Sequence, residues 1–236
     1  MTDRKLISVH SFLLVLLLII LVKGLLWGWS VLKDPRIFPI SKIEVEATYQ
    51  HVDPQTIQNA IAPCVNSSFF TVSISSIKQQ LLQLPWVYMV SVNRVWRDKI
   101  IIKVTEQTAV AQWNNNALLN SDGEVFAPPK STFPSNLPIL FGTEDQLKKV
   151  WQNYQQMNLA LAKLGLRVIQ VGMDKIGSMR LVLNNEVNLI LGDADIMNKF
   201  YMFIKVYPKI VGNNGDRVKN IDLRYENGLA IKWKNK

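Results

Sequence analysis

The chain has 236 residues, of which 48% are hydrophobic, so it can fill the cores of one large or two small domains. Its single cysteine excludes an intramolecular disulfide, and two histidines leave little material for metal or nucleophilic catalysis. The formal net charge is +9, and the last 40 residues hold nine basic against three acidic residues, a net +6. Such a surface suits an acidic protein, anionic lipid or nucleic acid, or is only a solvated face.

The first predicted element is a membrane-spanning helix over 12–32. These 21 residues contain one charge, Lys23, and match the roughly 20 apolar residues that cross about 30 Å of hydrocarbon. A cleaved secretory signal is the alternative, but no small-x-small cleavage site follows the apolar run. Basic residues balance on its two sides, so they leave the orientation open, while the short tail at 1–11 favours an internal N-terminus. A membrane anchor argues against nucleic acid as a partner.

After a proline-containing connector at 33–39, the segment 40–106 is predicted to fold in the order β-α-α-β-β. Asp53 and Ser73 are N-cap signals, and each precedes a run of apolar residues at helical spacing. The strands before and after these helices show apolar and polar residues in alternation. One small sheet covered on one face by two helices is the economical packing of such a unit.

The rest of the chain, 107–236, is predicted to be a β-rich domain with an antiparallel sheet and two helices. The helices occupy 144–164 and 194–207, and Gly165 and Pro208 end them. The predicted strands of this domain are 109–113, 117–119, 125–126, 166–172, 179–183, 187–191, 221–225 and 229–233. The whole chain is therefore expected to be an α+β protein with an N-terminal transmembrane helix.

The last two strands are predicted to form a hairpin. A three-residue loop with Gly228 in the left-handed conformation pairs Ile221 with Trp233 and Leu223 with Ile231, which gives one apolar and one polar face. No later element follows to cover the last strand, so we expect an open sheet edge there. Such an edge either accepts a strand from a partner or is protected from pairing by its lysines, and the residues leave both alternatives open.

No group of residues predicts catalysis, a metal or a cofactor. Ser75 and Lys78 match the S-x-x-K string of penicillin-recognising enzymes, but no S-D-N or K-T-G string accompanies them. His10 and His51 have no His, Cys or carboxylate neighbours at metal-ligand spacing. Dinucleotide-binding and Walker strings are also absent. The chain is therefore predicted not to be an enzyme and to need no cofactor.

Several strings carry a resemblance to a known family. They are LPWV at 84–87, VSV at 90–92, AQW at 111–113, DGEVF at 122–126, LPILFG at 137–142 and IDLRY at 221–225. In this order, after a short tail and a single span, they resemble the FtsQ (FtsQ/DivIB) family of bacterial cell division proteins over nearly the whole chain. The resemblance implies a polypeptide-transport-associated (POTRA) domain at 40–106 and a β domain at 107–236. It places both in the periplasm, on an inner-membrane protein whose N-terminus is cytoplasmic.

The resemblance further implies a scaffold at the division septum that binds FtsB and FtsL. Other division proteins are expected at the POTRA domain and the membrane helix. In the family the FtsB contact uses the last strands of the β domain. The matching positions here are Arg224, Tyr225, Asn227, Gly228, Leu229 and Trp233.

Two other classes of function stay open at this point. One is a POTRA-containing component of an outer-membrane assembly or secretion system, and the other is a membrane-anchored cell-wall hydrolase. A single POTRA unit without a following run of barrel strands favours the division scaffold over the first of these. A hydrolase would need a carboxylate or Ser/Lys pair in a cleft.

Overall fold

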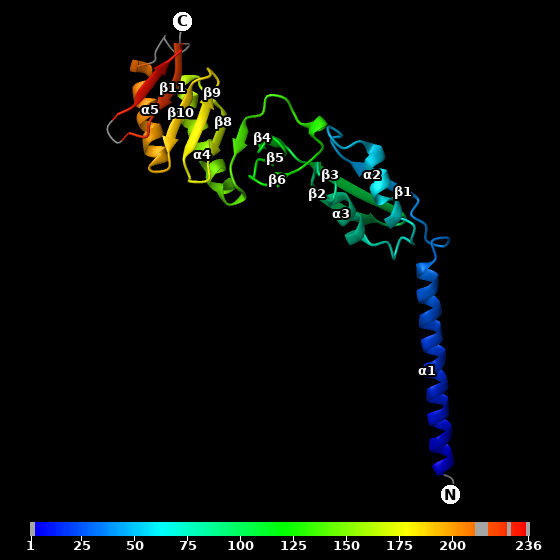
Figure 1. Cartoon of the computed structure of the whole chain (residues 1–236). Coiled ribbons are helices and arrows are strands. Elements are labelled where there is room, and N and C mark those ends of the chain that lie inside the picture. Colours follow the sequence, from blue (N-terminus) through cyan, green and yellow to red (C-terminus); the bar gives the residue numbers. More distant parts are fainter. Residues whose placement is uncertain (1–2, 211–216, 226–227, 235–236) are drawn as a thin grey trace. The chain divides into compact units, whose positions relative to one another are not determined.

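The structure is a computed structural model that describes residues 3–210, 217–225 and 228–234. The chain divides into two compact units, Met1–Gln107 and Thr108–Lys236 (Figure 1). The first contains a long helix and a small sheet, and the second is built on one large sheet. Mixed α and β structure in this order confirms the predicted fold class.

Helix α1 (Asp3–Lys33) contains the predicted membrane span. Its segment Leu14–Lys33 has a mean hydropathy of 2.3, and none of that segment is buried against the rest of the protein. A helix of this length exposes a large apolar surface that no described residue covers. By length and composition it fits the hydrocarbon core of a membrane.

The small sheet and its two helices fold in the predicted order. The elements are β1 (Lys42–Glu46), α2 (Pro54–Ile61), α3 (Ile74–Leu82), β2 (Val87–Val95) and β3 (Lys99–Glu106). The side chains of Asp53 and Ser73 accept hydrogen bonds from the backbone N–H groups of Thr56 and Ser76, so both predicted N-caps are confirmed. A short 3-10 turn, Ala62–Cys64, extends α2.

Strand β3 is the central strand of this sheet. It pairs in parallel with β1 and antiparallel with β2. Alternate β3 side chains are buried, as are two residues on each helix. The buried set is Ile57, Ile61, Ile77, Leu81, Ile100, Ile102 and Val104. Burying one face of the sheet against two apolar helix faces is therefore what holds this unit together.

The second unit contains nine strands in one sheet, in the spatial order β12-β11-β10-β9-β8-β7-β4-β5-β6. The strands are β4 (Ala109–Trp113), β5 (Ala117–Asn120), β6 (Val125–Phe126), β7 (Ile139–Phe141), β8 (Val168–Met173), β9 (Met179–Leu183), β10 (Asn188–Gly192), β11 (Val218–Asp222) and β12 (Ala230–Trp233). Helix α4 (Leu147–Leu161) contacts β7 and β8, and α5 (Ile196–Ile210) contacts β10 and α4 (Figure 1). Short 3-10 segments occupy Lys130–Thr132, Glu144–Gln146 and Ala162–Leu164.

The core of the second unit lies between the sheet and these two helices. Phe200 and Phe203 from α5 and Val150, Met157 and Leu161 from α4 are fully buried in it. Gly165 adopts the left-handed conformation at φ +66°, which ends the α4 segment as predicted. The buried side chains of α4 and α5 thus belong to the same core cluster as those of the strands.

Besides the register of the last two strands, three expectations for this unit were wrong. The sheet is mixed rather than antiparallel, because β4–β7, β7–β8 and β10–β11 are parallel pairs, of which the last two enclose a helix. Parallel neighbours need a crossover, and α4 and α5 supply those two crossovers. Strand β7 was not predicted, because three residues are too few for an alternation signal. Helix α5 continues through Pro208, since a proline in the last turn removes one backbone donor while Phe203 and Tyr207 still pack on the core.

Candidate functional site

Strand β12 lies at one end of the nine-stranded sheet. One of its sides pairs antiparallel with β11, and no other strand of the described residues pairs with its second side. An edge strand of this kind presents backbone N–H and C=O groups to any strand that approaches it. The open edge expected from the sequence is present in the structure.

The register of this edge differs from the prediction by two residues. Ile231 pairs with Ile221, and Ala230 pairs with Asp222, whereas Ile221 was expected opposite Trp233. The reason is that Leu223, directly after β11, is still bonded to β10, because its N–H donates to the carbonyl of Ile190 at 2.8 Å. The connection to β12 is therefore longer than three residues. A shift of two preserves the predicted faces, because side chains alternate with period two.

The inner face of the edge anchors β12 to the domain. Leu229 and Ile231 are partly buried and pack against the core cluster. Gly228 has no atom within 4 Å of the position that a Cβ would occupy, so close packing does not require glycine there. Asn227, and Glu226 before it, lie outside the described residues. Of the predicted site residues, Leu229 thus lies on the apolar face that the alternation of the last strand predicted.

Two aromatic side chains are exposed at the edge. Tyr225 is 57% exposed and Trp233 is 44% exposed. Tyr and Trp dominate binding energetics at protein interfaces because they bury large areas at a low entropic cost. Trp233 lies on β12 itself, whereas Tyr225 lies in the connection between β11 and β12 rather than on the predicted strand 221–225. Both are candidate anchors for a partner at this edge.

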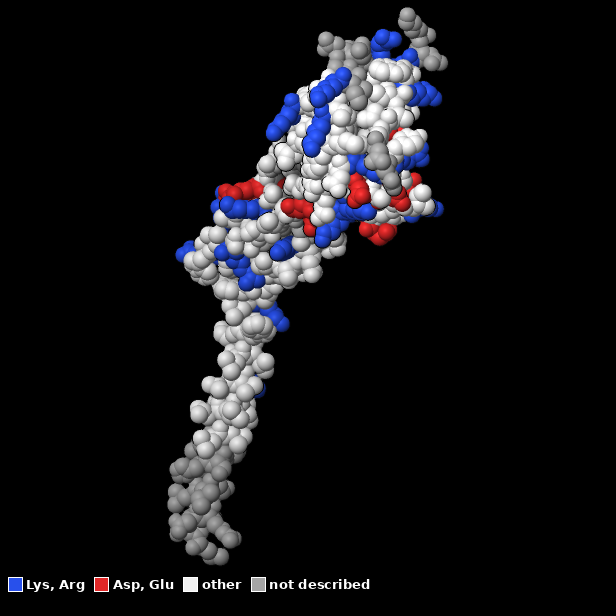
Figure 2. Space-filling model, turned by 90° about the vertical axis from the view of Figure 1, so that its left-hand side faces the viewer, with Lys and Arg blue, Asp and Glu red and all other residues white. Residues whose placement is uncertain are grey.

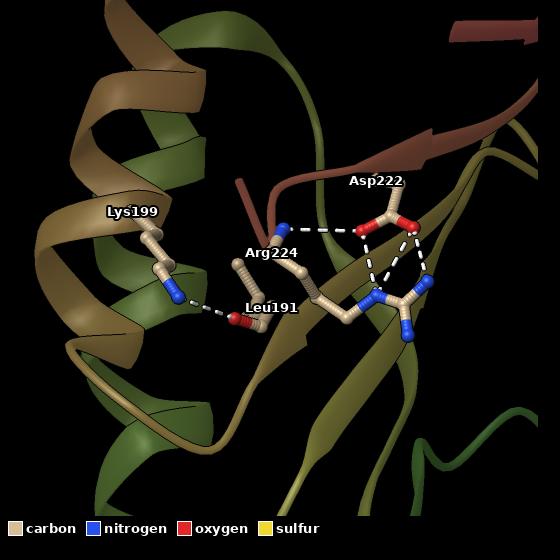
Figure 3. A network of polar contacts seen from close by, with 4 residues as sticks. All are labelled: Leu191, Lys199, Asp222 and Arg224. Carbon is tan, nitrogen blue, oxygen red and sulfur yellow. Dashed lines mark hydrogen bonds and ion pairs between the residues drawn. The ribbon is translucent and has the colours of Figure 1, made fainter. Parts of the chain in front are cut away.

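Arg224 is held in place by Asp222. Its Nε donates to both carboxylate oxygens at 3.0 Å, its Nη2 donates to Oδ2 at 2.6 Å, and its backbone N–H donates to Oδ1 at 3.1 Å (Figure 3). The Arg224 hydrogen bonds lower the pKa of Asp222, and the carboxylate in turn raises the pKa of Arg224. The Arg224 side chain is still 59% exposed, so a second carboxylate can reach it.

A glycine beside this pair makes room for it. A Cβ at Gly192 would lie 3.3 Å from Cγ of Arg224, and φ at this glycine is +78°. Lys199 on α5 lies on the other side of the same segment, with its Nζ 3.5 Å from the carbonyl oxygen of Leu191 (Figure 3). Gly192 therefore leaves room for the Arg224 side chain at the end of β10. Neither this contact nor the role of Asp222 is indicated by the sequence.

The end of β12 is basic and is fixed to the rest of the sheet. The Nζ of Lys234 lies 3.3 Å from Oε2 of Glu186, and its backbone N–H donates to the carbonyl of Arg217 at 2.7 Å. A hollow beside the strand is lined by Glu186, Asn188, Lys219, Lys232, Trp233 and Lys234. Figure 2 shows basic side chains near the top of the molecule, on the unit that carries the C-terminus. A partner for this edge should therefore be acidic.

Ser75 and His51, which carry the weak sequence signals for chemistry, lie in the first unit and contact neighbouring side chains there. The Ser75 hydroxyl lies 3.0 Å from the Ser73 hydroxyl, which caps α3. His51 stacks on Trp86 with ring centroids 3.7 Å apart, and its Nδ1 lies 3.4 Å from Oε2 of Glu106. Within the described residues, no group of three or more His, Cys, Asp or Glu side chains could hold a metal ion.

Comparison with known families and proteins agrees with this architecture. The family model described as POTRA domain, FtsQ-type, matches residues 38–107, and the model described as Cell division protein FtsQ/DivIB, C-terminal, matches residues 109–224. The cell division protein FtsQ of Coxiella burnetii is 35% identical over 234 residues, covering 99% of this chain and 96% of that protein. The chain belongs to the FtsQ/DivIB family of cell division proteins.

Other FtsQ proteins are also similar over most of the chain. FtsQ of Escherichia coli is 32% identical, with 94% of this chain and 82% of that protein covered. FtsQ of Allochromatium vinosum is 30% identical, with 87% of this chain and 83% of that protein covered. The family match of the C-terminal unit ends at Arg224, so β12 of this FtsQ family member lies beyond the matched residues.

Proposed function

We propose that this FtsQ family member is a non-enzymatic scaffold that binds FtsB through the open edge of β12. The observation that carries the proposal is an open edge strand that carries the exposed Trp233, preceded in the chain by the exposed Tyr225 and by the fixed, exposed Arg224. Backbone groups along the edge would supply hydrogen bonds to an added strand, and the side chains would select its sequence. FtsL would join through its association with FtsB.

Each predicted residue has a separate task in this proposal. Tyr225 and Trp233 would pack against apolar side chains of the added strand, and Arg224 would meet a carboxylate. Leu229 would keep the strand on the core, and Asn227 and Gly228 would shape the connection that precedes it. Because Asp222 already orients the guanidinium, Arg224 would lose little conformational entropy on binding.

The lysines of the edge favour one kind of partner over another. Lys232 and Lys234 would repel a second copy of the same basic edge, which protects the strand from self-pairing. They would attract an acidic partner and increase the rate of association at low salt. One set of charges can thus serve both alternatives that the sequence left open.

The same proposal places the chain in the inner membrane. The tail 1–11 would be cytoplasmic, the span 12–32 would cross the bilayer, and the connector 33–39 would lead to the POTRA domain at 40–106 and the β domain at 107–236 in the periplasm. Anchoring the domain on the same membrane as its partners would raise their effective concentration. The POTRA domain would recruit further division proteins and direct the chain to the septum.

Binding of a labelled periplasmic FtsB segment to the full-length chain in lipid nanodiscs tests the strand-addition proposal. Saturable binding that weakens with rising salt is expected, and Tyr225→Ala should weaken it at least about tenfold. Tyr201→Ala is the matched control, because Tyr201 is also an exposed tyrosine of this unit but lies on α5. Equal affinities of the two variants would refute the role of the edge.

Localisation separates this function from the other two classes. A fluorescent fusion of the full-length chain should concentrate at midcell in dividing cells. A uniform envelope signal would instead favour an outer-membrane assembly or secretion component. Degradation of purified cell wall by the full-length protein would favour the hydrolase and contradict the scaffold.

A further inference from the structure

The end of the POTRA unit that receives the chain from α1 carries a group of aromatic residues. Phe38, Phe69, Phe70 and Trp96 form it, with ring centroids of 4.9 Å for Phe38–Phe70, 5.5 Å for Phe69–Phe70 and 6.0 Å for Phe70–Trp96. Phe69 is buried, and its ring contacts those of Phe70 and Trp96. The four residues come from three separate segments of the chain. We call this group of four aromatic residues the aromatic end.

Backbone contacts bring these segments together beside the end of α1. The Ser68 hydroxyl donates to the carbonyl of Leu32 in the last turn of the helix, and the N–H of Phe69 donates to the carbonyl of Phe38 at 2.9 Å. The third segment is the turn between β2 and β3, where the carbonyl of Asp98 accepts from the N–H of Ser41 at 3.0 Å. The aromatic end is therefore attached to the chain within a few residues of Lys33, where the apolar span ends.

The outer side of the aromatic end is exposed and apolar. Trp96 is 69% exposed, Phe70 is 37% exposed, and Ile37 of the connector is 51% exposed. Exposed aromatic residues at a fixed location commonly mark a binding surface. Trp in particular favours the boundary between hydrocarbon and water, because its ring is apolar and its N–H is polar.

Basic residues accompany this surface. Arg36 precedes Ile37, Arg97 follows Trp96, and both arginines are exposed. Lys33 lies at the end of α1, with its Nζ 5.3 Å from the ring centroid of Trp29. Asp34 and Asp98 are the acidic residues nearby in the chain. The Asp34 carboxylate accepts from the backbone N–H of Arg36 at 2.8 Å, and the backbone carbonyl of Asp98, not its carboxylate, accepts from Ser41. Cationic side chains beside apolar ones match a layer of anionic headgroups over hydrocarbon.

We propose that the aromatic end rests on the anionic lipid surface of the bilayer that α1 crosses, with Trp96, Phe70 and Ile37 in the headgroup region. The occupant is lipid rather than a protein, because the surface begins within a few residues of the apolar span and has the residue types of a membrane interface. This inference rests on the proposed membrane anchoring and goes beyond it. It gives the POTRA unit a defined side towards the membrane.

Quenching of Trp96 fluorescence by brominated lipids tests the inference on the full-length chain. Wild type and Trp96→Phe would be placed in nanodiscs of phosphatidylglycerol and phosphatidylcholine, with and without bromine on the acyl chains. The difference in emission between the two proteins gives the fluorescence of Trp96 alone. We expect its emission to lose more than about half of its intensity in brominated discs. Quenching should be weaker in discs of phosphatidylcholine alone, because Arg36 and Arg97 favour anionic lipid.

A matched control uses the other end of the same strand. Tyr88→Trp in the Trp96→Phe background places a tryptophan near the start of β2, and its emission should not change with bromination. An unquenched Trp96 would overturn the inference and leave the surface for a protein partner. Equal quenching in the two disc compositions would overturn the part given to the arginines.

The remaining tryptophans separate this result from a failure of the anchor. Trp27 and Trp29 lie within α1, so the emission of Trp96→Phe itself should be partly quenched. Loss of that quenching would contradict the membrane span. Its persistence beside an unquenched Trp96 would contradict only the lipid contact of the aromatic end.

Discussion

Replacing Trp233 by alanine should weaken FtsB binding about 10- to 100-fold. A tryptophan side chain presents up to about 250 Å², and 44% of Trp233 is exposed, which leaves roughly 110 Å² for a partner to cover. At about 25 cal/mol per Å², complete cover contributes about 2.7 kcal/mol. Since each 1.4 kcal/mol is about tenfold in Kd, complete cover corresponds to about 100-fold and half cover to about tenfold.

Fluorescence anisotropy of a labelled FtsB segment, titrated with the full-length chain in nanodiscs, would measure this change. Trp96→Ala is the matched control, because it removes another exposed tryptophan from the other unit and should leave the Kd unchanged. Thermal unfolding by circular dichroism would show whether Trp233→Ala keeps its fold. Leu229 and Ile231 still anchor the strand, so only a small change in the unfolding temperature is expected.

The reasoning would be refuted if a correctly folded Trp233→Ala variant raised the Kd for FtsB by less than about twofold, because the estimate requires the partner to cover the exposed indole area. An equal loss in Trp96→Ala would refute it in another way. That result would place the contact on the first unit.

Three further predictions concern residues that support the two units. Arg224 lowers the pKa of Asp222, so the stability from this pair is present above the unfolded Asp pKa of about 3.9 and is lost as pH falls through the lower folded value. In acid unfolding curves, the stability difference between wild type and Asp222→Asn should therefore disappear at low pH. A difference that does not depend on pH would contradict this cause. Burial raises the pKa of Glu106, but hydrogen bonds from Thr48 and from the backbone N–H groups of His51 and Gln50 outweigh it and lower the pKa overall. Glu106→Ala should cost about 2 kcal/mol and speed hydrogen exchange at residues 48–51, and unchanged exchange there would show that these bonds hold nothing in place. Gly123→Ala should lower the free energy of unfolding by about 2 kcal/mol or more, since φ is +80° and the new Cβ would lie 2.6 Å from Cδ1 of Trp151. Gly165→Ala, with φ +66° and open space around the new Cβ, should lower it by about 1 kcal/mol. Equal losses in denaturant unfolding would exclude the clash with Trp151.

Local features of the sequence were enough for the helices and for most strands. Asp53 and Ser73 satisfy backbone N–H groups within three residues, so their capping is readable without knowledge of the fold. The apolar span is likewise a property of one continuous segment. The apolar face shared by Ile221 and Ile231 follows from alternation within each strand.

The candidate site was only partly accessible in this way. The sequence indicated an edge strand that ends near Trp233, and Trp233 on β12 and Tyr225 before it are both exposed. It did not indicate that Asp222 holds Arg224. It also did not indicate that Gly192 makes room for the arginine, because that contact joins residues 32 positions apart. The partner contacts of Arg224, Tyr225, Asn227, Gly228, Leu229 and Trp233 stay predictions.

The sequence by itself thus determined the order and character of the elements, since spacing and caps act within a few residues along the chain. Only the tertiary structure decided which strands are neighbours, which pairs are parallel, and in which register β12 pairs with β11. Strand pairing depends on contacts between segments far apart in the chain. The hydrogen bond from Leu223 to Ile190, for example, moves the edge register by two residues without changing any local pattern.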